Sequence, residues 1–295
     1  MIKDLIYSFI IGDSYGLSIL DNETDNSDIK LKFNKTLNIE KGYFSFFTTN
    51  LLATIDSIST NKNIAIKDIL NKLVLSLIVG KYTNDGTVRK ADIETLNILE
   101  YYSKKNNLYY NYNNNDLNSN PISRVLPITI YNYYNTDTLD TLIPVVSLTT
   151  NNEVVLLGCF IYYKYLLNLI NGYDKYKSLK IYIPDYFNNE TKKIYKNILK
   201  GNIYYKDITF DDNIINVLKI VFYVILNSDN MNDVLLILSN LSGCTNIYSS
   251  LTLVLASFIY GFDSIPNTLK KDLKNKKEIN KYIKEFERIF IWKNI

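Results

Sequence analysis

Apolar residues recur at helical spacing along most of the chain. Within Ile66–Val79 they fall at i, i+3, i+4 and i+7, and the pattern stops at Gly80, a residue typical of helix ends. The same spacing predicts helices over Lys3–Gly12, Asn50–Ser59, Thr87–Lys104, Pro121–Tyr134, Asn151–Leu169, Glu190–Leu199, Asn213–Asn227, Met231–Ser239, Ser249–Tyr260 and Asn267–Trp292. We therefore expect an all-α fold in a single domain, residues 1–295, with residues 267–295 as an amphipathic C-terminal helical tail.

Three segments depart from the helical spacing. Asp21–Asp28 is acidic and polar, and it predicts a loop. Tyr109–Asn120 is dense in Asn and Tyr, a composition typical of a surface loop. Leu179–Tyr186 resembles a β-strand, although Pro184 limits its pairing.

Composition excludes several kinds of chemistry. The chain has no histidine, which excludes Ser-His, Cys-His and His-metal mechanisms. Its 33 basic and 30 acidic residues give a net charge of +3, too balanced to predict a nucleic-acid partner. The run Lys270–Lys284 contains acidic residues too, and it predicts a solvated helix face rather than a binding patch.

Cysteine usage and hydropathy indicate the compartment. Two distant cysteines, Cys159 and Cys244, predict a reducing, cytoplasmic environment. No apolar run approaches the ~20 residues of a membrane helix, so we expect no membrane partner. The apolar N-terminus is interrupted by Lys3 and Asp4, which is not typical of a secretion signal. Abundant Asn, Lys, Ile and Tyr favour an AT-rich source genome, that of a virus, phage, protist or bacterium.

A motif near the C-terminus carries the most specific signal. Residues 240–247 read Asn-Leu-Ser-Gly-Cys-Thr-Asn-Ile, and an apolar stretch with small residues follows. This segment resembles the C-terminal signature of the ADP-ribosylglycohydrolases, Asn-Leu-Gly-Gly-Asp-x-Asp-Thr, whose aspartates hold metal ions. Gly243 keeps its place, whereas the aspartate positions carry Cys244 and Asn246 and the threonine position carries Ile247.

A second segment resembles the same family and departs from it in the same way. Residues 45–48 read Ser-Phe-Phe-Thr where the family has Thr-Asp-Asp-Thr. Ser45 and Thr48 match the two threonines, and Phe46 and Phe47 stand on the aspartate pair. Hard cations such as Mg²⁺ need oxygen ligands, which a phenyl ring does not offer.

The N-terminus resembles a third family signature. Residues 10–17 include Gly-Asp-Ser-Tyr-Gly, similar to the family's Gly-Asp-x-x-Gly, with Asp13 as the aspartate. The glutamate that follows in the family falls on Leu20, and Asp21 stands beside it. The matched glutamate is therefore lost, while Asp13 is kept.

Two further stretches match in the middle of the chain. Residues 119–127 resemble Asn-Gly-x-x-Met-Arg-x-x-Pro and keep Arg124. Residues 147–150 resemble Ser-x-Thr-His, with Thr150 in the histidine position. Five motifs in the family's order imply the family's all-helical, ADP-ribosylglycohydrolase-like fold across most of the chain.

The lost ligands imply a pseudoenzyme. Family hydrolysis uses a two-metal site that orients the ribose and the attacking water. With four aspartate positions and one glutamate replaced, we expect no metal, no cofactor and no catalytic residue. Function would then lie in a structural or protein-interaction module with a protein partner or self-assembly, which the 26 tyrosines favour.

Two alternatives stay open. The chain could be a non-hydrolysing binder, a sensor or sponge of an ADP-ribose-related nucleotide, or a metal-independent glycohydrolase that uses Asp13 or Asp21. The residues expected to line a retained pocket are Asp13, Leu20, Asp21, Thr48, Arg124, Thr150 and Gly243. Whether Phe46 and Phe47 fill the pocket or leave it open would separate the structural module from the binder.

Some candidates also have plain structural interpretations. Asp13 could cap a helix end rather than face a ligand. Arg124 needs a partner if buried, and could position a loop or a phosphate. Cys244 lacks the histidine base that a nucleophilic thiol needs, so we do not expect it to be catalytic.

Overall fold

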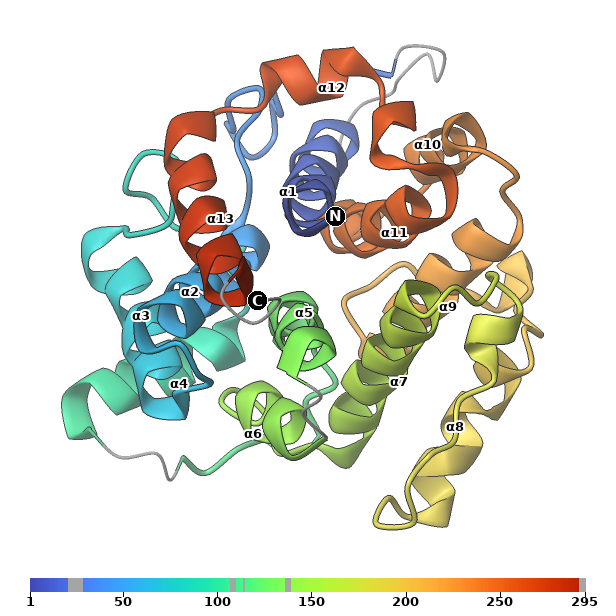
Figure 1. Cartoon of the computed structure of the whole chain (residues 1–295), viewed down its shortest axis with the longest axis horizontal. Helices are drawn as coiled ribbons and strands as arrows, with labels where there is room; N and C mark the ends of the chain where they lie inside the picture. The colour runs from blue at the N-terminus through green and yellow to red at the C-terminus, as the bar shows by residue number, and fades with distance from the viewer. Residues whose placement is uncertain (21–28, 107–109, 114, 136–138, 292–295) are drawn as a thin grey trace.

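The computed structural model describes residues 1–20, 29–106, 110–113, 115–135 and 139–291 (Figure 1). Within these residues the fold is all-α, with no β-strand and only two isolated bridges. The α-helices are α1 (Ile2–Ile19), α2 (Phe46–Asn61), α3 (Ile66–Val79), α4 (Ile93–Lys105), α5 (Val125–Asn135), α6 (Leu142–Val146), α7 (Glu153–Ile170), α8 (Asn189–Leu199), α9 (Ile214–Leu226), α10 (Met231–Ser239), α11 (Thr245–Tyr260), α12 (Asn267–Asp272) and α13 (Lys276–Ile291). Short 3₁₀ turns are η1 (Asn120–Arg124), η2 (Leu139–Thr141), η3 (Lys177–Leu179), η4 (Tyr205–Asp207) and η5 (Phe262–Ser264).

The core is organised around α1 and α11, which come from opposite ends of the sequence and pack together (Figure 1). Every residue of α1 except Lys3 and Asp4 is buried, so this helix has no solvent face. Gly12 and Gly16 make the contact close. A Cβ atom on Gly12 would lie 2.4 Å from the backbone oxygen of Ser249 in α11. The two glycines of the N-terminal motif therefore set the distance between the two helices.

The remaining helices surround this pair. α2 packs against α3 and α13, and α3 packs against α4, on one side of the molecule (Figure 1). α9 and α10 pack against α11, and α7 contacts α5, α9 and α11. α8 contacts α7 and α9 and lies at the outer edge, on the opposite side from α2–α4 (Figure 1).

Several boundaries differ from the predicted ones. The helix predicted from Thr87 begins at Ile93, because Asp92 accepts a hydrogen bond from the Thr95 amide and caps the helix there. Residues 180–184 form no strand. The predicted tail is two helices, interrupted at 273–275, and the second packs against α2 and α1. The predicted Asp21–Asp28 loop, Trp292 and Tyr109 lie outside the described residues.

α7 overturns the expectation that no apolar stretch approaches the length of a membrane helix. Its 18 residues have a mean hydropathy of 1.5, enough by length and composition alone to cross a membrane. However, 61% of the helix is buried inside the protein, against its neighbours in the core. A core helix satisfies the same composition test, so we interpret α7 as one. No other described helix satisfies it.

Candidate functional site

Three of the sequence motifs meet at the N-terminus of α2. Asp13, in the middle of α1, points at this helix end and accepts four hydrogen bonds on its Oδ2 atom. Ser45 donates from its amide at 3.0 Å and its hydroxyl at 2.9 Å. Thr48 donates from its amide at 3.1 Å and its hydroxyl at 2.6 Å. A carboxylate here also complements the positive end of the helix dipole.

Asp13 is thus a capping residue, but it caps α2 rather than its own helix. Its side chain is fully buried. Burial raises the pKa of Asp13 above its ordinary value, and the hydrogen bonds from Thr48 and Ser45 offset only part of that rise.

The Ser45 hydroxyl joins the N-terminal motif to the C-terminal one. Besides donating to Asp13, it accepts from the Phe47 amide at 3.1 Å and from Asn246 Nδ2 at 3.1 Å. A hydroxyl has one proton and two lone pairs, so these three bonds use its full capacity. Thr245, next to Asn246, donates its hydroxyl to the Gly16 carbonyl at 2.7 Å. Residues far apart in the sequence are therefore held in one junction.

The two phenylalanines of the second motif are both buried. Phe46 is 0% exposed and Phe47 is 1% exposed, so both side chains lie in the interior. The Phe47 ring stacks on Phe9 of α1, with 5.1 Å between ring centroids and 13° between planes. Both rings belong to the buried core, and they do not face solvent.

Not every polar atom at the junction is paired. Asp13 Oδ1 and Asn246 Oδ1 are buried without a hydrogen-bond partner, as are both side-chain polar atoms of Asn50. Unpaired buried polar atoms are costly and are usually satisfied by water when the space allows. The junction is closed, yet it keeps some unused hydrogen-bonding capacity.

The residues at this junction do not fit a pair of divalent cations. The positions matched to aspartates hold two phenyl rings, a thiol and an amide, from Phe46, Phe47, Cys244 and Asn246. Mg²⁺ prefers carboxylate and other hard oxygen ligands. Over the described part of the chain, no group of three or more His, Cys, Asp or Glu side chains is placed to hold a metal ion.

The other residues of the C-terminal motif surround the start of α11. Gly243 has a φ of +76°, and a Cβ atom there would lie 2.3 Å from the Phe210 carbonyl oxygen, which explains why glycine occupies the position. Cys244 is half-buried, and burial raises the pKa of its thiol. Ile247 is buried in α11. Leu20 follows the last residue of α1, and Asp21 lies outside the described residues.

Arg124 and the residue 147–150 motif form a second, separate cluster. The Arg124 side chain is fully buried and donates to the Val145 and Val146 carbonyls, at 3.2 and 3.1 Å. It also donates to the Thr149 hydroxyl at 2.7 Å. Burial lowers the pKa of Arg124 to about 10. Arg124 therefore holds the chain that follows α6, and Thr150 accepts from the Asn152 amide at 3.1 Å.

Comparisons with known proteins identify the family of the chain. The family model described as ADP-ribosylglycohydrolase matches residues 2–293. The chain belongs to the ADP-ribosylglycohydrolase family. A solved structure titled "ADP-ribosylglycohydrolase-related protein complex" is similar, with a TM-score of 0.76 over 98% of this chain and 99% of that one. Only 14% of residues are identical, so this likeness concerns the fold. No curated protein sequence matches the chain.

ADP-ribosylglycohydrolases are normally enzymes, and this member has the family's all-α fold. Gly12, Gly16 and Gly243 each allow a close backbone approach. Asp13 and Arg124 both make internal hydrogen bonds, although Asp13 Oδ1 and Arg124 Nη1 have no partner among the described residues. These five residues therefore have structural roles here.

One feature of this chain was not predicted from its sequence. A groove of about 850 Å³ lies beside α8, far from the α2 junction in the fold. Five lysines line it, namely Lys180, Lys192, Lys193, Lys196 and Lys200. The balanced net charge concealed this local concentration, because acidic residues elsewhere offset it. The repeated lysines of the predicted helix Glu190–Leu199 were the available signal.

Proposed function

We propose that this chain is a pseudoenzyme of the ADP-ribosylglycohydrolase family that acts as a structural or protein-interaction module. One observation carries the proposal: the positions matched to metal-binding aspartates hold no carboxylate, and three of the four, Phe46, Phe47 and Asn246, are buried. Phe47 stacks on Phe9, and Asn246 donates to Ser45. A two-metal mechanism needs open coordination positions for substrate and water. A closed junction with apolar rings offers neither.

An activity assay tests the proposal. The purified chain is incubated with ADP-ribosylated protein in Mg²⁺ buffer, in parallel with an active family member, and free ADP-ribose is quantified with and without EDTA. We expect no release above the protein-free control. Release that depends on Mg²⁺ and disappears on chelation would overturn the proposal. Calorimetry with Mg²⁺ alone provides a second measurement, for which we expect no heat of binding.

The second candidate is a non-hydrolysing binder of an ADP-ribose-related nucleotide. The unpaired buried oxygens of Asp13 and Asn246 favour it, because they could accept hydrogen bonds from ribose hydroxyls if the junction opened. Against it, the rings of Phe46 and Phe47 occupy the interior beside them. Calorimetry with ADP-ribose distinguishes the two. Saturable binding would favour the binder, and its absence the structural module.

A metal-independent glycohydrolase is the least supported candidate. A general acid or base must come within hydrogen-bonding distance of the reacting group. Asp13 is fully buried and already accepts four hydrogen bonds, so it does not reach solvent in this conformation. Release of ADP-ribose in EDTA that an Asp13→Asn variant lacks would be needed to support this candidate.

A further inference from the structure

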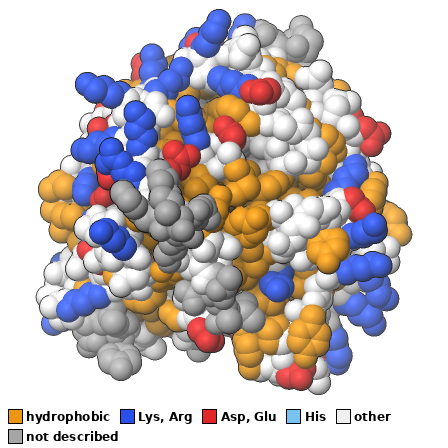
Figure 2. Space-filling model, viewed as in Figure 1, with side chains coloured by type: hydrophobic (Ala, Val, Ile, Leu, Met, Phe, Trp, Pro, Cys, Tyr) orange, Lys and Arg blue, Asp and Glu red, His pale blue; other side chains and the backbone are white. Residues whose placement is uncertain are grey.

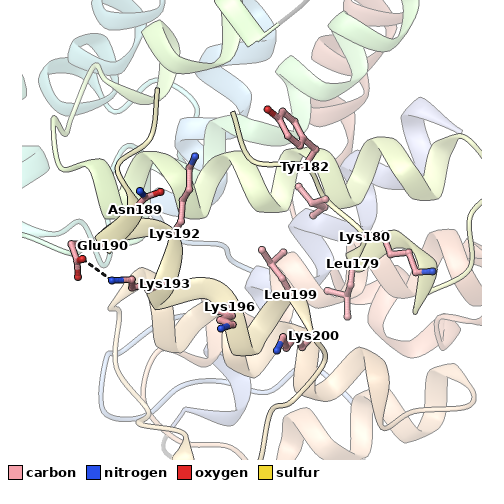
Figure 3. A pocket seen from close by; sticks show the side chains of 11 residues that line it. Leu179, Lys180, Tyr182, Asn189, Glu190, Lys192, Lys193, Lys196, Leu199 and Lys200 are labelled. Atoms are coloured by element: carbon pink, nitrogen blue, oxygen red, sulfur yellow. Dashed lines mark hydrogen bonds and ion pairs between the residues drawn. The ribbon is translucent and has the colours of Figure 1, made fainter. Parts of the chain in front are cut away.

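The lysine-lined groove at the edge of the molecule has no role in the family chemistry. It lies between α8 and the irregular segment 180–184 that follows η3 (Figure 3). Leu179 and Leu199 contribute apolar surface to it, and Tyr182, 73% exposed, stands beside it. Figure 3 shows the α8 lysines along one wall and Lys180 on the opposite segment.

The groove concentrates positive charge. Its lining carries five Lys and one Glu, a net charge of +4, whereas the whole chain carries +3. Lys193 pairs with Glu190 at 2.8 Å and Lys192 with Asp185 at 3.5 Å. Within the described residues, the three other lysines, Lys180, Lys196 and Lys200, form no ion pair.

Lysines cluster in a second place, over α12 and α13. Figure 2 shows acidic side chains among the basic ones there, whereas the basic side chains at the α8 edge have fewer acidic neighbours. Lys281 pairs with Glu278, and Arg288 pairs with Glu285, on α13. Residues 267–291 also carry a net charge of +4, from eight basic and four acidic side chains, so charge alone does not distinguish the α8 edge. What the α8 edge adds is the groove.

The lysine spacing on α8 matches an extended peptide. Lys192, Lys196 and Lys200 stand four residues apart, so successive lysines rise about 6 Å along the helix. Alternate side chains of an extended chain are about 6.7 Å apart on one face. An acidic residue at every second position would therefore meet successive lysines, while the intervening side chains could contact the apolar surface of Leu179 and Leu199.

The opposite wall offers backbone groups. Within the described residues, no hydrogen bond is accepted by the carbonyl groups of Lys180, Ile181 or Tyr182, and none is donated by the Tyr182 amide. This is the segment whose sequence resembled a strand. Addition of an extended peptide along such an edge is a common mode of recognition, in which backbone pairs supply affinity and side chains supply specificity.

We propose that the α8 groove binds an extended, acidic segment of a partner protein, with acidic residues alternating with aliphatic ones. Its backbone pairs with residues 180–182, and its carboxylates meet Lys180, Lys196 and Lys200. A peptide fits better than a nucleic acid because the groove has apolar surface and an open backbone edge. It has a single exposed aromatic ring, whereas single-stranded nucleic acids are usually held on several.

The test is fluorescence anisotropy with a labelled ten-residue peptide of alternating Glu and Val. We expect saturable binding that weakens several-fold between 50 and 300 mM salt. The variant Lys180→Glu/Lys196→Glu/Lys200→Glu should bind at least tenfold more weakly, with an unchanged circular dichroism melt. The matched control Lys67→Glu/Lys105→Glu/Lys277→Glu changes the same charge at exposed lysines elsewhere and should lose little affinity.

Three outcomes would overturn the proposal: no saturable binding of the acidic peptide, equal loss of affinity in the control variant, or tighter binding of a ten-nucleotide oligothymidylate.

Peptides N-methylated at every Glu or at every Val test the backbone pairing, because the amides of alternate residues face the same edge of an extended chain. One of the two N-methylated peptides should bind more weakly than the unmethylated peptide. If both bind as tightly as the unmethylated peptide, the backbone pairing is absent. The inference rests on the interaction role proposed above, but a failure here leaves the hydrolysis assay unaffected.

Discussion

The capping of α2 by Asp13 gives the sharpest quantitative prediction. Replacing Asp13 with Ala removes the acceptor of four buried hydrogen bonds. The hydroxyls of Ser45 and Thr48 can turn to other acceptors, but their two backbone amides cannot. Each buried donor left without a partner costs about 1–3 kcal/mol, so we expect Asp13→Ala to lower the free energy of unfolding by about 2–6 kcal/mol.

The conservative variant isolates the hydrogen bonds from the charge. Asp13→Asn keeps an acceptor oxygen in the Oδ2 position, and its amide nitrogen replaces Oδ1, which has no partner. We expect Asp13→Asn to cost about 1–3 kcal/mol, the penalty for one buried amide group without a partner, and therefore less than Asp13→Ala. Asp4→Ala is the matched control. Asp4 lies on the same helix but is part-exposed, and its loss should change stability by no more than about 0.5 kcal/mol.

The pH dependence gives an independent measurement. Burial raises the pKa of Asp13 above its ordinary value of 3.8, so the folded chain binds this proton more tightly than the unfolded chain. The contribution of Asp13 to stability is therefore fully present below pH 3.8 and decreases as pH rises through the raised pKa. Asp13→Asn has no such group, so the difference in stability between wild type and Asp13→Asn should shift in favour of the variant as pH rises.

Urea unfolding monitored by circular dichroism, from pH 3.5 to 8, measures both effects. The reasoning would be refuted by an Asp13→Ala variant as stable as the Asp4→Ala control. That result would mean that water or a rearranged side chain satisfies the two α2 amides. A difference between wild type and Asp13→Asn that moves in the opposite direction with pH would refute the electrostatic part alone.

Three further predictions concern the packing of the core. Phe46→Asp/Phe47→Asp should lower the free energy of unfolding in EDTA buffer by more than the ~3–5 kcal/mol of a buried Phe→Ala change, because each new carboxylate would be buried without a partner. A urea melt like that of the wild type would show that the rings face an open pocket. Gly16→Ala should lower the free energy of unfolding by about 1–3 kcal/mol, because the new methyl would lie 2.3 Å from a backbone oxygen of α11. A Gly→Ala change normally stabilises a helix, so a higher melting temperature would contradict this prediction. Iodoacetamide should leave Cys159 unmodified in the native protein and alkylate it in urea, because the thiol is buried and its pKa is raised to about 12, as peptide mass spectrometry can check.

Local patterns determined the helices. Ile66–Val79 and Met231–Ser239 were predicted with the bounds that the structure shows, because their apolar period and their end signals are local. The family motifs also followed from residue order alone, and the match over residues 2–293 confirms the membership they implied. The sequence further determined that Phe46 and Phe47 cannot bind metal, since that depends only on side-chain chemistry.

Roles that depend on distant partners were decided only by the tertiary structure. Asp13 was a candidate for capping a helix end, but only the structure shows that the helix is α2, more than 30 residues away in the sequence. The sequence left two roles for Arg124, which were to position a loop or to bind a phosphate. Its hydrogen bond to Thr149 shows that it positions a loop. The basic groove needed both α8 and the 180–184 segment to be positioned. Helical period and residue chemistry are properties of neighbours in the sequence, whereas partners, burial and local charge arise only when distant segments pack together.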